Sequence, residues 1–477
     1  MTQLAYLSAS EILTAYRQRA LSPVEVVDAV IARSRQTEPD VNALTYTYFD
    51  QARDAAREAE KRYMGKTADN PFPLDGICVA VKDSGHIAGQ PTSAGSLLSK
   101  DIAQPATSPI NQRVLRAGGI VHARSATPEY SCAAVTLSKR WGITRNPWNL
   151  DMTPGGSSGG AAAALAAGSA TLATGSDIAG SIRIPAACCG VVGYKPPRGR
   201  NPVDAPFNLD TYCHTGPMAR TVADALLFQN VLSGPHAEDP TTLPYQRIAP
   251  GDASIKGLRL AVSSDLGFFP VDPEVVASLD KAIQLFTDLG ARVEEVVLPW
   301  KADVLDATLT HLRHIFGTSI APDTAEDWEK LTPYARSFAQ AGLEVTPKDY
   351  FAALTTAGAA AQSFGAVMSQ YDLFICPTTT VPAVAADFDP GSQSLQVAGQ
   401  TVDPMLGWVM TSPFNMLSTH PVLSVPVSQA ENQVPIAIQI VGRPFDEATV
   451  FQAALAFEAE RGHWFADDAP QPFLPHP

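Results

Sequence analysis

The chain has 477 residues, 45% of them hydrophobic and 17% charged, which is enough apolar side chain for a sizeable core. Its formal net charge of −14 argues against a general affinity for nucleic acids or anionic membranes. The six cysteines form no CxxC pair, which is typical of buried thiols in a reducing compartment.

The first residues lack the basic and apolar regions of a secretory signal. The longest run of small apolar residues, 161–172, is too short to span a bilayer. We therefore expect a cytoplasmic protein that does not contact a membrane.

The first third of the chain predicts helices followed by a buried strand. Ser22 and Glu25 form a capping box, with proline at the first helical position between them. A second helix is expected over residues 50–63, with alanines along one side. Residues 77–81 form a continuous apolar run of strand length, which indicates a strand covered on both faces and ended by Lys82.

Helical patterns and short apolar runs alternate through the rest of the chain. We expect strands at residues 120–121, 191–192, 258–262, 293–298, 422–427 and 436–441, and helices at 221–232, 272–290 and 446–458. In the helix over 272–290, the residues expected to face the core are Val276, Leu279, Ile283 and Phe286. The pattern predicts an α/β fold with a mixed sheet in one compact domain.

Residues 153–160, TPGGSSGG, are the most informative stretch. A flexible glycine–serine linker is the alternative interpretation. The alanine-rich residues 161–167 follow at once, however, and predict a helix. A glycine-rich turn that opens a helix usually brings backbone N–H groups against a ligand or another backbone segment.

A second turn with a serine, GSDIAGSIRIP, follows at residues 175–185. The backbone N–H groups of Ile178, Ala179 and Gly180 can face a developing oxyanion beside the Ser181 hydroxyl. Two charged side chains flank the turn and are close enough in sequence to brace it as a structural ion pair: Asp177 and Arg183.

A nucleophilic serine needs a base, and none of the nine histidines stands in a recognisable context. His311 and His314 share helical spacing but have no acidic or cysteine neighbour, which favours a surface position over a metal site. Lys82 is the remaining candidate base. A solvent-exposed lysine at a strand end is the alternative, and the residues alone leave that choice open.

Taken together, these stretches resemble the amidase signature family of serine amidohydrolases in order, spacing and chemistry. The resemblance covers the chain from about residue 7 to 460. Beyond the two serine-containing turns it includes residues 76–83, 141–149, 189–196, 371–373, 377–378 and 439–442.

The resemblance implies a twisted mixed β-sheet core surrounded by α-helices, in the α/β class. We expect a single domain over residues 1–477. Its N-terminal helices would occupy about 8–64, the signature core about 70–235 and the C-terminal part about 250–465.

The same resemblance implies the catalytic residues. Ser181 would be the nucleophile, and Ser157, after a cis peptide bond, would bridge it to Lys82. Ser158 and Ser176 would support the site, and Ser176 stands where threonine is frequent. Ala179 replaces a frequent glycine but keeps its N–H, so its methyl group bears on substrate size and not on the chemistry.

The implied reaction is hydrolysis of an amide carbon–nitrogen bond, or of a carbamate (urethane) or ester, through an acyl-enzyme on Ser181. Burial would lower the pKa of Lys82 so that a neutral amine is present to act as base. We expect no cofactor and no metal, a small-molecule amide and water as the reactants, and a monomer or homodimer. Nucleic acids and membranes are not expected partners.

Three alternatives remain open at this point. Residues 155–159 also match GxSxG, the nucleophile elbow of α/β-hydrolases, which would make Ser157 the nucleophile of an esterase with His420 or His463 as base. That assignment leaves Lys82 and the region around 181 unexplained. A glutaminase-like component of a tRNA-dependent amidotransferase shares the signature, but the C-terminal third shows no convincing acidic site for glutamine. A binding module with a dead site conflicts with the three reactive side chains.

The substrate is less well defined. Parts of the sequence are similar to the branch of the family that cleaves cyclic and linear amide oligomers, and aryl acylamides, carbamates and fatty amides remain open. Pocket walls are expected from residues 129–132, including Tyr130 and Cys132, and from the loops near 315 and 410. Trp408 and Phe414 would suit an apolar or aromatic substrate, with a place in the core as the alternative.

Overall fold

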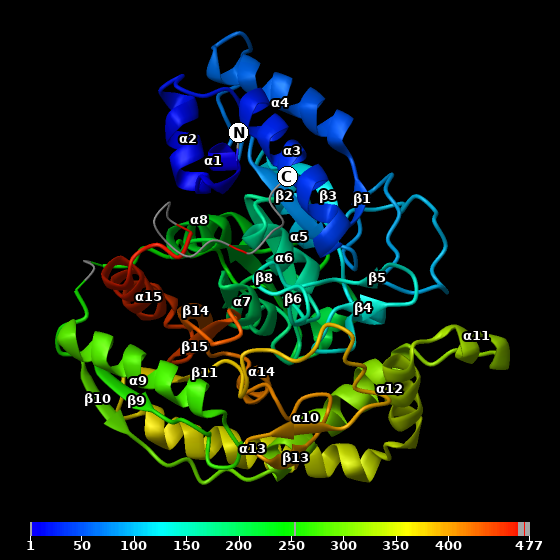
Figure 1. Cartoon of the computed structure of the whole chain (residues 1–477), viewed down its shortest axis with the longest axis vertical. Helices are drawn as coiled ribbons and strands as arrows, with labels where there is room; N and C mark the ends of the chain where they lie inside the picture. Colours follow the sequence, from blue (N-terminus) through cyan, green and yellow to red (C-terminus); the bar gives the residue numbers. More distant parts are fainter. Residues whose placement is uncertain (1, 252–253, 466–471, 473–477) are drawn as a thin grey trace.

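A mixed sheet of 11 strands forms the centre of the computed structural model, which describes residues 2–251, 254–465 and 472. Figure 1 shows it extending from the N-terminal helices at the top to the C-terminal part at the bottom. In order across the sheet the strands are β1 (Leu44–Thr47), β3 (Ile120–Ser125), β2 (Cys78–Lys82), β6 (Leu172–Asp177), β8 (His214–Ala219), β7 (Val192–Lys195), β14 (Val422–Gln429), β15 (Pro435–Gly442), β11 (Leu373–Pro377), β9 (Arg259–Val262) and β10 (Arg292–Glu295).

Two groups of three strands are parallel, β3–β2–β6 and β11–β9–β10, and the strands between them pair antiparallel. Two small hairpins lie outside this sheet, β4 (Leu137–Ser138) with β5 (Gly142–Ile143), and β12 (Leu395–Val397) with β13 (Gln400–Val402). The expected α/β class with a mixed sheet is confirmed.

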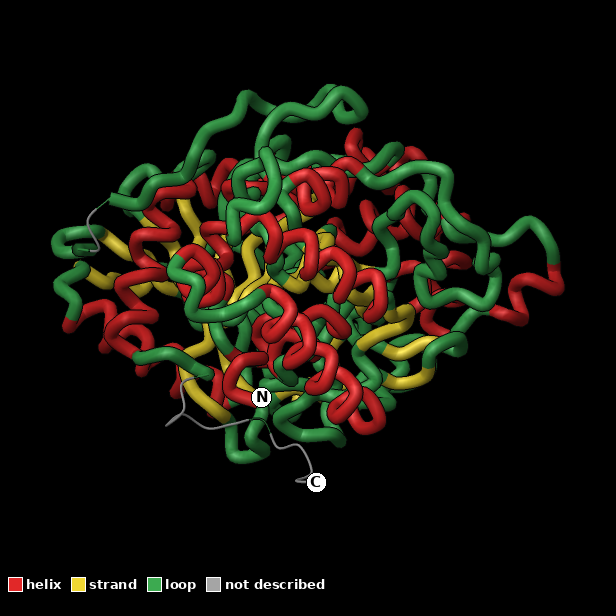
Figure 2. The backbone as a smooth tube through the Cα atoms, turned by 90° about the horizontal axis from the view of Figure 1, so that it is seen from above, coloured by secondary structure: helices red, strands yellow, loops and turns green. Residues whose placement is uncertain are grey.

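Helices surround the sheet, as the view from above shows (Figure 2). They are α1 (Thr2–Tyr6), α2 (Ala9–Arg17), α3 (Pro23–Val41), α4 (Phe49–Tyr63), α5 (Pro109–Arg116), α6 (Gly159–Ala166), α7 (Arg183–Cys189), α8 (Val222–Leu232), α9 (Pro273–Asp288), α10 (Asp303–Leu312), α11 (Ala325–Lys330), α12 (Pro333–Glu344), α13 (Pro347–Met368), α14 (Pro413–Met416) and α15 (Glu447–Arg461). Single-turn helices lie at η1 (Glu129–Ser131) and η2 (Phe207–Leu209), and a π-helical turn, η3 (Arg313–Gly317), continues α10.

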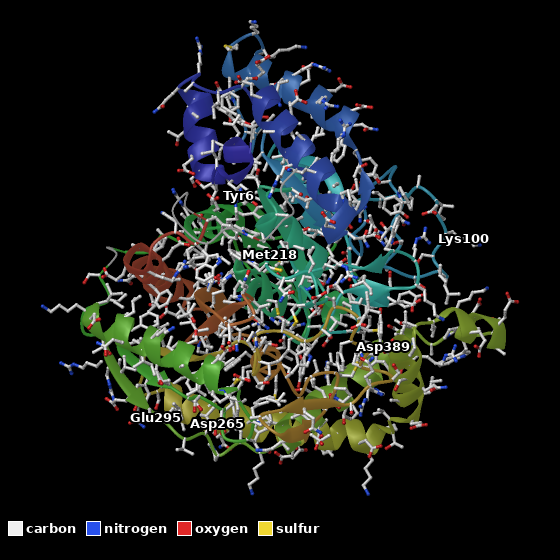
Figure 3. All side chains as sticks on the ribbon, in the orientation of Figure 1. Tyr6, Lys100, Met218, Asp265, Glu295 and Asp389 are labelled. Atoms are coloured by element: carbon white, nitrogen blue, oxygen red, sulfur yellow. The ribbon has the colours of Figure 1, made fainter. Side chains whose placement is uncertain are left out.

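Each face of the sheet is covered by its own apolar layer. Along β11, Leu373 and Ile375 contact the layer that contains α8, α9 and α15, whereas Phe374 and Cys376 contact the layer that contains α10, α12 and α13. Neighbouring side chains of a strand point to opposite faces, so a strand covered on both faces carries a continuous apolar run. Figure 3 places Met218 of β8, which is fully buried, near the centre, and the exposed Lys100 and Glu295 at the rim.

The local sequence signals predicted several elements correctly. Ser22 caps α3 with Glu25 completing the capping box, and α4, β2, α8 and α15 lie where the patterns placed them. For α9, two of the four residues predicted to face the core are wrong, each by one position along the chain. Val275 and Ala282 are buried together with Leu279 and Phe286, while the predicted Val276 and Ile283 are half-buried.

Apart from the helical spacing of His311 and His314, no helix was predicted between residues 303 and 368, although α12 and α13 each begin with a threonine cap followed by proline. The longest, α13, is rich in alanine, glycine and threonine and has a mean hydropathy of 1.2 over an 18-residue stretch that is 22% buried. Among the described residues it is the one helix with the length and composition of a membrane span, and by itself this is weak evidence for one.

Candidate active site

Two parallel strands end at the same edge of the sheet and bring Lys82 against two serines. Lys82 is the last residue of β2, whose neighbour β6 carries Ser176 near its own end. The Lys82 Nζ donates to Ser157 Oγ at 2.6 Å and to Ser176 Oγ at 2.9 Å. Ligand sites in open α/β sheets favour this carboxyl edge.

Burial makes Lys82 suited to act as a base. The residue is 3% exposed, and removal from water lowers the pKa of its amine from 10.5 to about 7, although Cys213 and Asp177 partly oppose the shift. The charged form of a buried lysine loses hydration that its protein partners do not fully replace. Near neutral pH a large fraction of this amine is therefore unprotonated.

Ser157 is positioned by a backbone that runs unusually close to its neighbours. The Gly156–Ser157 peptide bond is cis, and a Cβ on Gly156 would lie 2.3 Å from the carbonyl oxygen of Val135. The helix that follows, α6, is buried along its whole length. A Cβ on Gly160 would meet the Ala126 N at 2.3 Å, so small residues let α6 pack directly onto the strands.

Ser181 lies in the turn after β6 and lines a cavity. The Ser158 N–H donates to the Ser181 carbonyl oxygen at 3.1 Å, which joins the two serine-containing turns. Within the described part of the chain no hydrogen bond links the Ser181 and Ser157 hydroxyls. The structure brings the two turns of Ser157 and Ser181 together, as the sequence predicted. The expected bridge between the Ser157 and Ser181 hydroxyls is not formed among the described residues.

The expected N–H donors in this turn are not equivalent. The Gly180 N–H donates to Asp177 Oδ1 at 2.8 Å, so it is already engaged and its prediction as an oxyanion donor needs correction. The N–H groups of Ile178, Ala179 and Ser181 make no hydrogen bond to any described residue, and all three residues line the cavity. The unengaged donors are therefore those three.

A buried ion pair fixes the shape of this turn. Arg183 donates to both carboxylate oxygens of Asp177, at 2.9 and 3.0 Å, and both side chains are fully buried. Burial raises the pKa of Asp177, but the Arg183 guanidinium, together with hydrogen bonds from Arg183 and Asn415, more than offsets this and holds the pKa below its ordinary value. The ion pair expected from the sequence is present.

The partners of this ion pair in the C-terminal part were missed. Arg183 also donates to Gln439 Oε1 at 2.6 Å and to Asn415 Oδ1 at 2.6 Å, and Thr411 Oγ1 donates to the Ala179 carbonyl at 2.6 Å. Gln439 lies in a stretch that carries the family resemblance, so it had a signal in the sequence. Nothing in the sequence pairs Asn415 or Thr411 with a turn more than 200 residues earlier.

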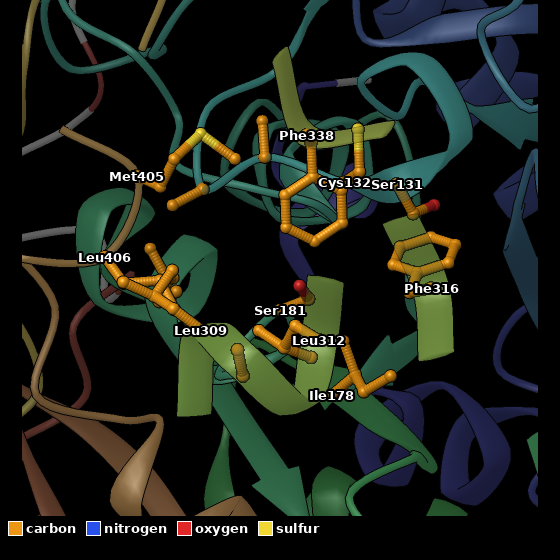
Figure 4. Close-up of a pocket in the computed structure, with 14 residues that line it drawn as sticks. Ser131, Cys132, Ile178, Ser181, Leu309, Leu312, Phe316, Phe338, Met405 and Leu406 are labelled. Atoms are coloured by element: carbon orange, nitrogen blue, oxygen red, sulfur yellow. The ribbon is translucent and has the colours of Figure 1, made fainter. Parts of the chain in front are cut away.

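A narrow cavity of about 30 Å³ opens beside Ser181. Figure 4 shows the Ser181 hydroxyl among Leu309, Leu312, Phe316 and Phe338. The remaining lining residues are Ser131, Cys132, Ala133, Ala134, Ile178, Ala179, Ile184, Met405 and Leu406. None of these side chains is charged, so the narrow cavity suits an apolar group.

A wide cavity of about 180 Å³ adjoins the narrow one, and the two share Ser131, Ile178 and Phe316. Ser157 lines only the wide cavity, and Ser181 lines only the narrow one. The other residues of the wide cavity are Ser84, Tyr130, Ser176, Val203, Asp204, Phe207, Cys213 and Thr215. The predicted wall residues Tyr130 and Cys132 therefore line one cavity each.

Two predicted pocket residues belong to the core instead. Trp408 and Phe414 are fully buried in the layer of α10, α12 and α13, and neither lines either cavity. Phe414 packs edge-on against Phe364 of that layer. The loop near 410 reaches the narrow cavity through Met405 and Leu406.

The histidine pair does not lie on the surface as expected. His311 is 3% exposed, its Nε2 is 2.9 Å from Asp210 Oδ1, and its ring stacks on Tyr212 at 3.8 Å. Asp210 comes from a distant part of the chain, so the sequence around the histidines gave no sign of this partner. His314 is half-buried beside Tyr350.

The histidines of the nucleophile-elbow alternative do not contact Ser157. The His420 Nδ1 is 2.7 Å from the carbonyl oxygen of Gly442, and burial lowers the pKa of His420 to about 4. His463 is exposed. The Ser157 hydroxyl instead contacts Lys82, which removes the geometric basis for an esterase built on Ser157.

The chain is similar to known proteins over nearly its whole length. A family model described as Amidase matches residues 25–451. The chain is 33% identical to an acylamidase of Rhodococcus erythropolis over 96% of each protein. It is also 30% identical to a glutamyl-tRNA(Gln) amidotransferase subunit of Carboxydothermus hydrogenoformans, over 96% of this chain and 97% of that protein.

Among solved structures, a bacterial aryl acylamidase of the amidase signature family superposes with a TM-score of 0.89 at 29% identity. The superposition covers 95% of this chain and 96% of that one. The chain therefore belongs to the amidase family, and its sequence and fold are those of a hydrolase of amide carbon–nitrogen bonds.

Proposed function

We propose that this amidase uses Ser181 as nucleophile, Ser157 as proton relay and Lys82 as base, and that it cleaves anilides of short acids. The observation that carries the proposal is the buried Lys82 amine, with a pKa of about 7, hydrogen-bonded to Ser157 beside a cavity that Ser181 lines. A general base is most effective when its pKa lies near the working pH.

The reaction begins when the Ser181 hydroxyl attacks the substrate carbonyl. Ser181 passes its proton to Ser157, which passes its own to the neutral Lys82 amine. No hydrogen bond to a described side chain holds the Ser181 hydroxyl, so it can rotate toward Ser157 as the substrate binds. The free N–H groups of Ile178, Ala179 and Ser181 stabilise the oxyanion.

The same relay then runs in reverse. Lys82 returns the proton through Ser157 to the nitrogen of the leaving amine, and the carbon–nitrogen bond breaks. Water, deprotonated along the same path, then hydrolyses the ester on Ser181. An ester or carbamate carbonyl fits the same steps, because the relay acts on the leaving atom whatever its identity.

The two cavities orient the substrate. The acyl carbon must bond to Ser181, which faces the narrow cavity, and the leaving nitrogen must reach Ser157, which faces the wide one. A slim apolar acyl group therefore occupies the narrow cavity and the amine occupies the wide one. The aromatic side chains of Tyr130, Phe207 and Phe316 in the wide cavity suit an aryl amine.

Two relatives support this substrate class, since one is an acylamidase and a structural neighbour is an aryl acylamidase. The amidotransferase role fits less well, because the narrow cavity beside Ser181 has no charged residue to bind the amino group of glutamine. Amide oligomers would have to place a long chain in a cavity of about 30 Å³.

The remaining expectations accompany this proposal. We propose one domain, because strands from residue 44 to residue 442 share one sheet. We further propose a cytoplasmic enzyme, monomeric or homodimeric, whose partners are a small amide and water. The free thiols at all six cysteines fit a reducing compartment.

Site-directed variants test the catalytic assignment on a series of short-chain anilides. Ser181→Ala should abolish turnover, and Ser157→Ala and Lys82→Met should each lower kcat on the order of 10²–10⁴-fold, as expected for loss of a proton-transfer partner. Ser278→Ala, which removes a buried serine on α9 bonded to Ser428, is the matched control. A fluorophosphonate should label Ser181, and a label on Ser157 would overturn the assignment.

A further inference from the structure

The wide cavity contains one acidic side chain that the proposed reaction does not use. Asp204 lies in the loop between β7 and β8 and lines both the wide cavity and a smaller one of about 60 Å³. The smaller cavity is also lined by Lys82 and Ser176, so Asp204 lies near the proton relay. It is half-buried.

The carboxylate of Asp204 has no cationic partner. Among the described residues no Lys, Arg or His lies within ion-pair distance of it, and its hydrogen-bond partner is the Ser108 hydroxyl. Two histidines, His86 and His236, favour the charged form of the carboxylate electrostatically from a longer distance, and Glu238 disfavours it. An unpaired carboxylate taken out of water is unfavourable, and a cation placed beside it would offset that cost.

Lys82 does not fill this role. Burial holds its amine largely neutral, and the groups that favour its charged form are Cys213 and Asp177, not Asp204. The reaction also requires a neutral Lys82. Lys82 therefore leaves the Asp204 carboxylate available to a cationic group of the substrate.

We propose that Asp204 is a specificity residue that selects leaving amines bearing a second, positively charged amino group. The inference rests on the proposed function, in which the amine occupies the wide cavity on the Ser157 side. The preferred substrates are then short-chain acyl derivatives of diamines: the acyl group is slim and apolar, one nitrogen is acylated, and the other is an ammonium that contacts Asp204.

Two acetanilides of similar size test the proposal, one with a 4-aminomethyl group and one with a 4-ethyl group. Wild type should prefer the ammonium compound by about tenfold in kcat/KM, the ratio that corresponds to about 1.4 kcal/mol. Asp204→Asn should remove this preference by raising KM for the ammonium compound alone. Asp204→Glu, which keeps the charge, should retain part of it.

The control variant is Glu238→Gln, which removes an exposed carboxylate that acts on Asp204 from outside the wide cavity. It should leave the preference unchanged. If Asp204→Asn lowers kcat/KM equally for both acetanilides, Asp204 has a structural role and the proposal is overturned. A wild type that hydrolyses both compounds equally would do the same.

A second measurement does not depend on turnover. Cys213 lines the wide cavity with Asp204 and is half-buried, whereas the other five cysteines are buried. The Cys213 thiol loses its proton to solvent, displaces methanesulfinate from a methanethiosulfonate and forms a mixed disulfide, which mass spectrometry detects, with Cys213→Ser as the blank. The two reagents are 2-aminoethyl and propyl methanethiosulfonate. Because burial raises the pKa of this thiol, the rates of the two reagents are compared at one fixed pH.

The rate ratio of the cationic to the neutral reagent should fall several-fold in Asp204→Asn. An unchanged ratio would refute the cation site even if the enzyme hydrolyses anilides. A fall in the ratio in a protein that hydrolyses neither acetanilide would refute the proposed substrate class and leave the cation site standing. The two proposals can therefore fail separately.

Discussion

Replacing Lys82 by methionine should change how the stability of the fold depends on pH. The folded-state pKa of about 7 lies below the ordinary 10.5 that the unfolded chain retains. Below pH 7 the folded protein holds a charged, buried amine, and one pKa unit is worth about 1.4 kcal/mol, so Lys82 destabilises the fold by up to about 5 kcal/mol there.

The sign of the pH dependence follows from proton counts. Between about pH 7 and 10.5 the unfolded chain binds the Lys82 proton and the folded chain does not, so stability rises with pH. Above that window both states are neutral and the penalty disappears. Wild type should gain about 2–3 kcal/mol relative to Lys82→Met between roughly pH 7.5 and 9.5.

Urea unfolding followed by tryptophan fluorescence measures this difference at several pH values. Methionine also removes the hydrogen bonds to Ser157 and Ser176, but that loss does not vary with pH. The informative result is therefore how the difference in unfolding free energy between wild type and Lys82→Met changes with pH. The matched control is Lys100→Met, which removes an exposed lysine. Parallel stability curves for wild type and Lys82→Met would refute a depressed pKa and the neutral base with it.

Three further predictions concern the reaction and the turn after β6. First, kcat/KM should rise with pH, reach half its maximum near pH 7 and then level off, because only neutral Lys82 accepts a proton; a profile that falls over this range would contradict the base assignment. Second, Asp177→Asn leaves the Arg183 charge buried without its partner and should lower the unfolding free energy by about 3–5 kcal/mol, a loss that chemical denaturation would measure. Third, Gly180→Ala should lower both Tm and kcat, because its φ is +121° and the new Cβ would lie 1.9 Å from Thr411 Oγ1, whereas Gly358→Ala on α13, with no atom within 4 Å, should be neutral or slightly stabilising. An active Gly180→Ala with wild-type Tm would contradict this account of the turn.

Local patterns in the sequence predicted the elements whose signals are complete within a short window. The capping box at Ser22 and the apolar run before Lys82 are such signals, and the structure has α3 and β2 there. The face of α9 was harder to predict, because Val275 and Val276 are equally apolar and the packing against the sheet decides which one is buried.

The position of aromatic and histidine side chains could not be predicted in the same way. Trp408, a predicted pocket residue, is buried in the core, whereas Phe316, which was not predicted, lines both cavities from the helical turn η3 where a loop was expected. His311 is buried against Asp210 and Tyr212, which come from another part of the chain. Such contacts depend on which segments the fold brings together.

The sequence by itself supplied the motifs that resemble the amidase signature family, and that resemblance implied which side chains react. Each of these motifs spans only a few positions, so the resemblance could assign Lys82, Ser157 and Ser181 without coordinates, although the residues alone left the role of Lys82 open. Only the tertiary structure decided that the Lys82 amine is removed from water, that the Gly180 N–H is taken by Asp177, and that Ser157 and Ser181 face different cavities. Desolvation and cavity shape arise from segments hundreds of residues apart, and no local pattern in the sequence records them.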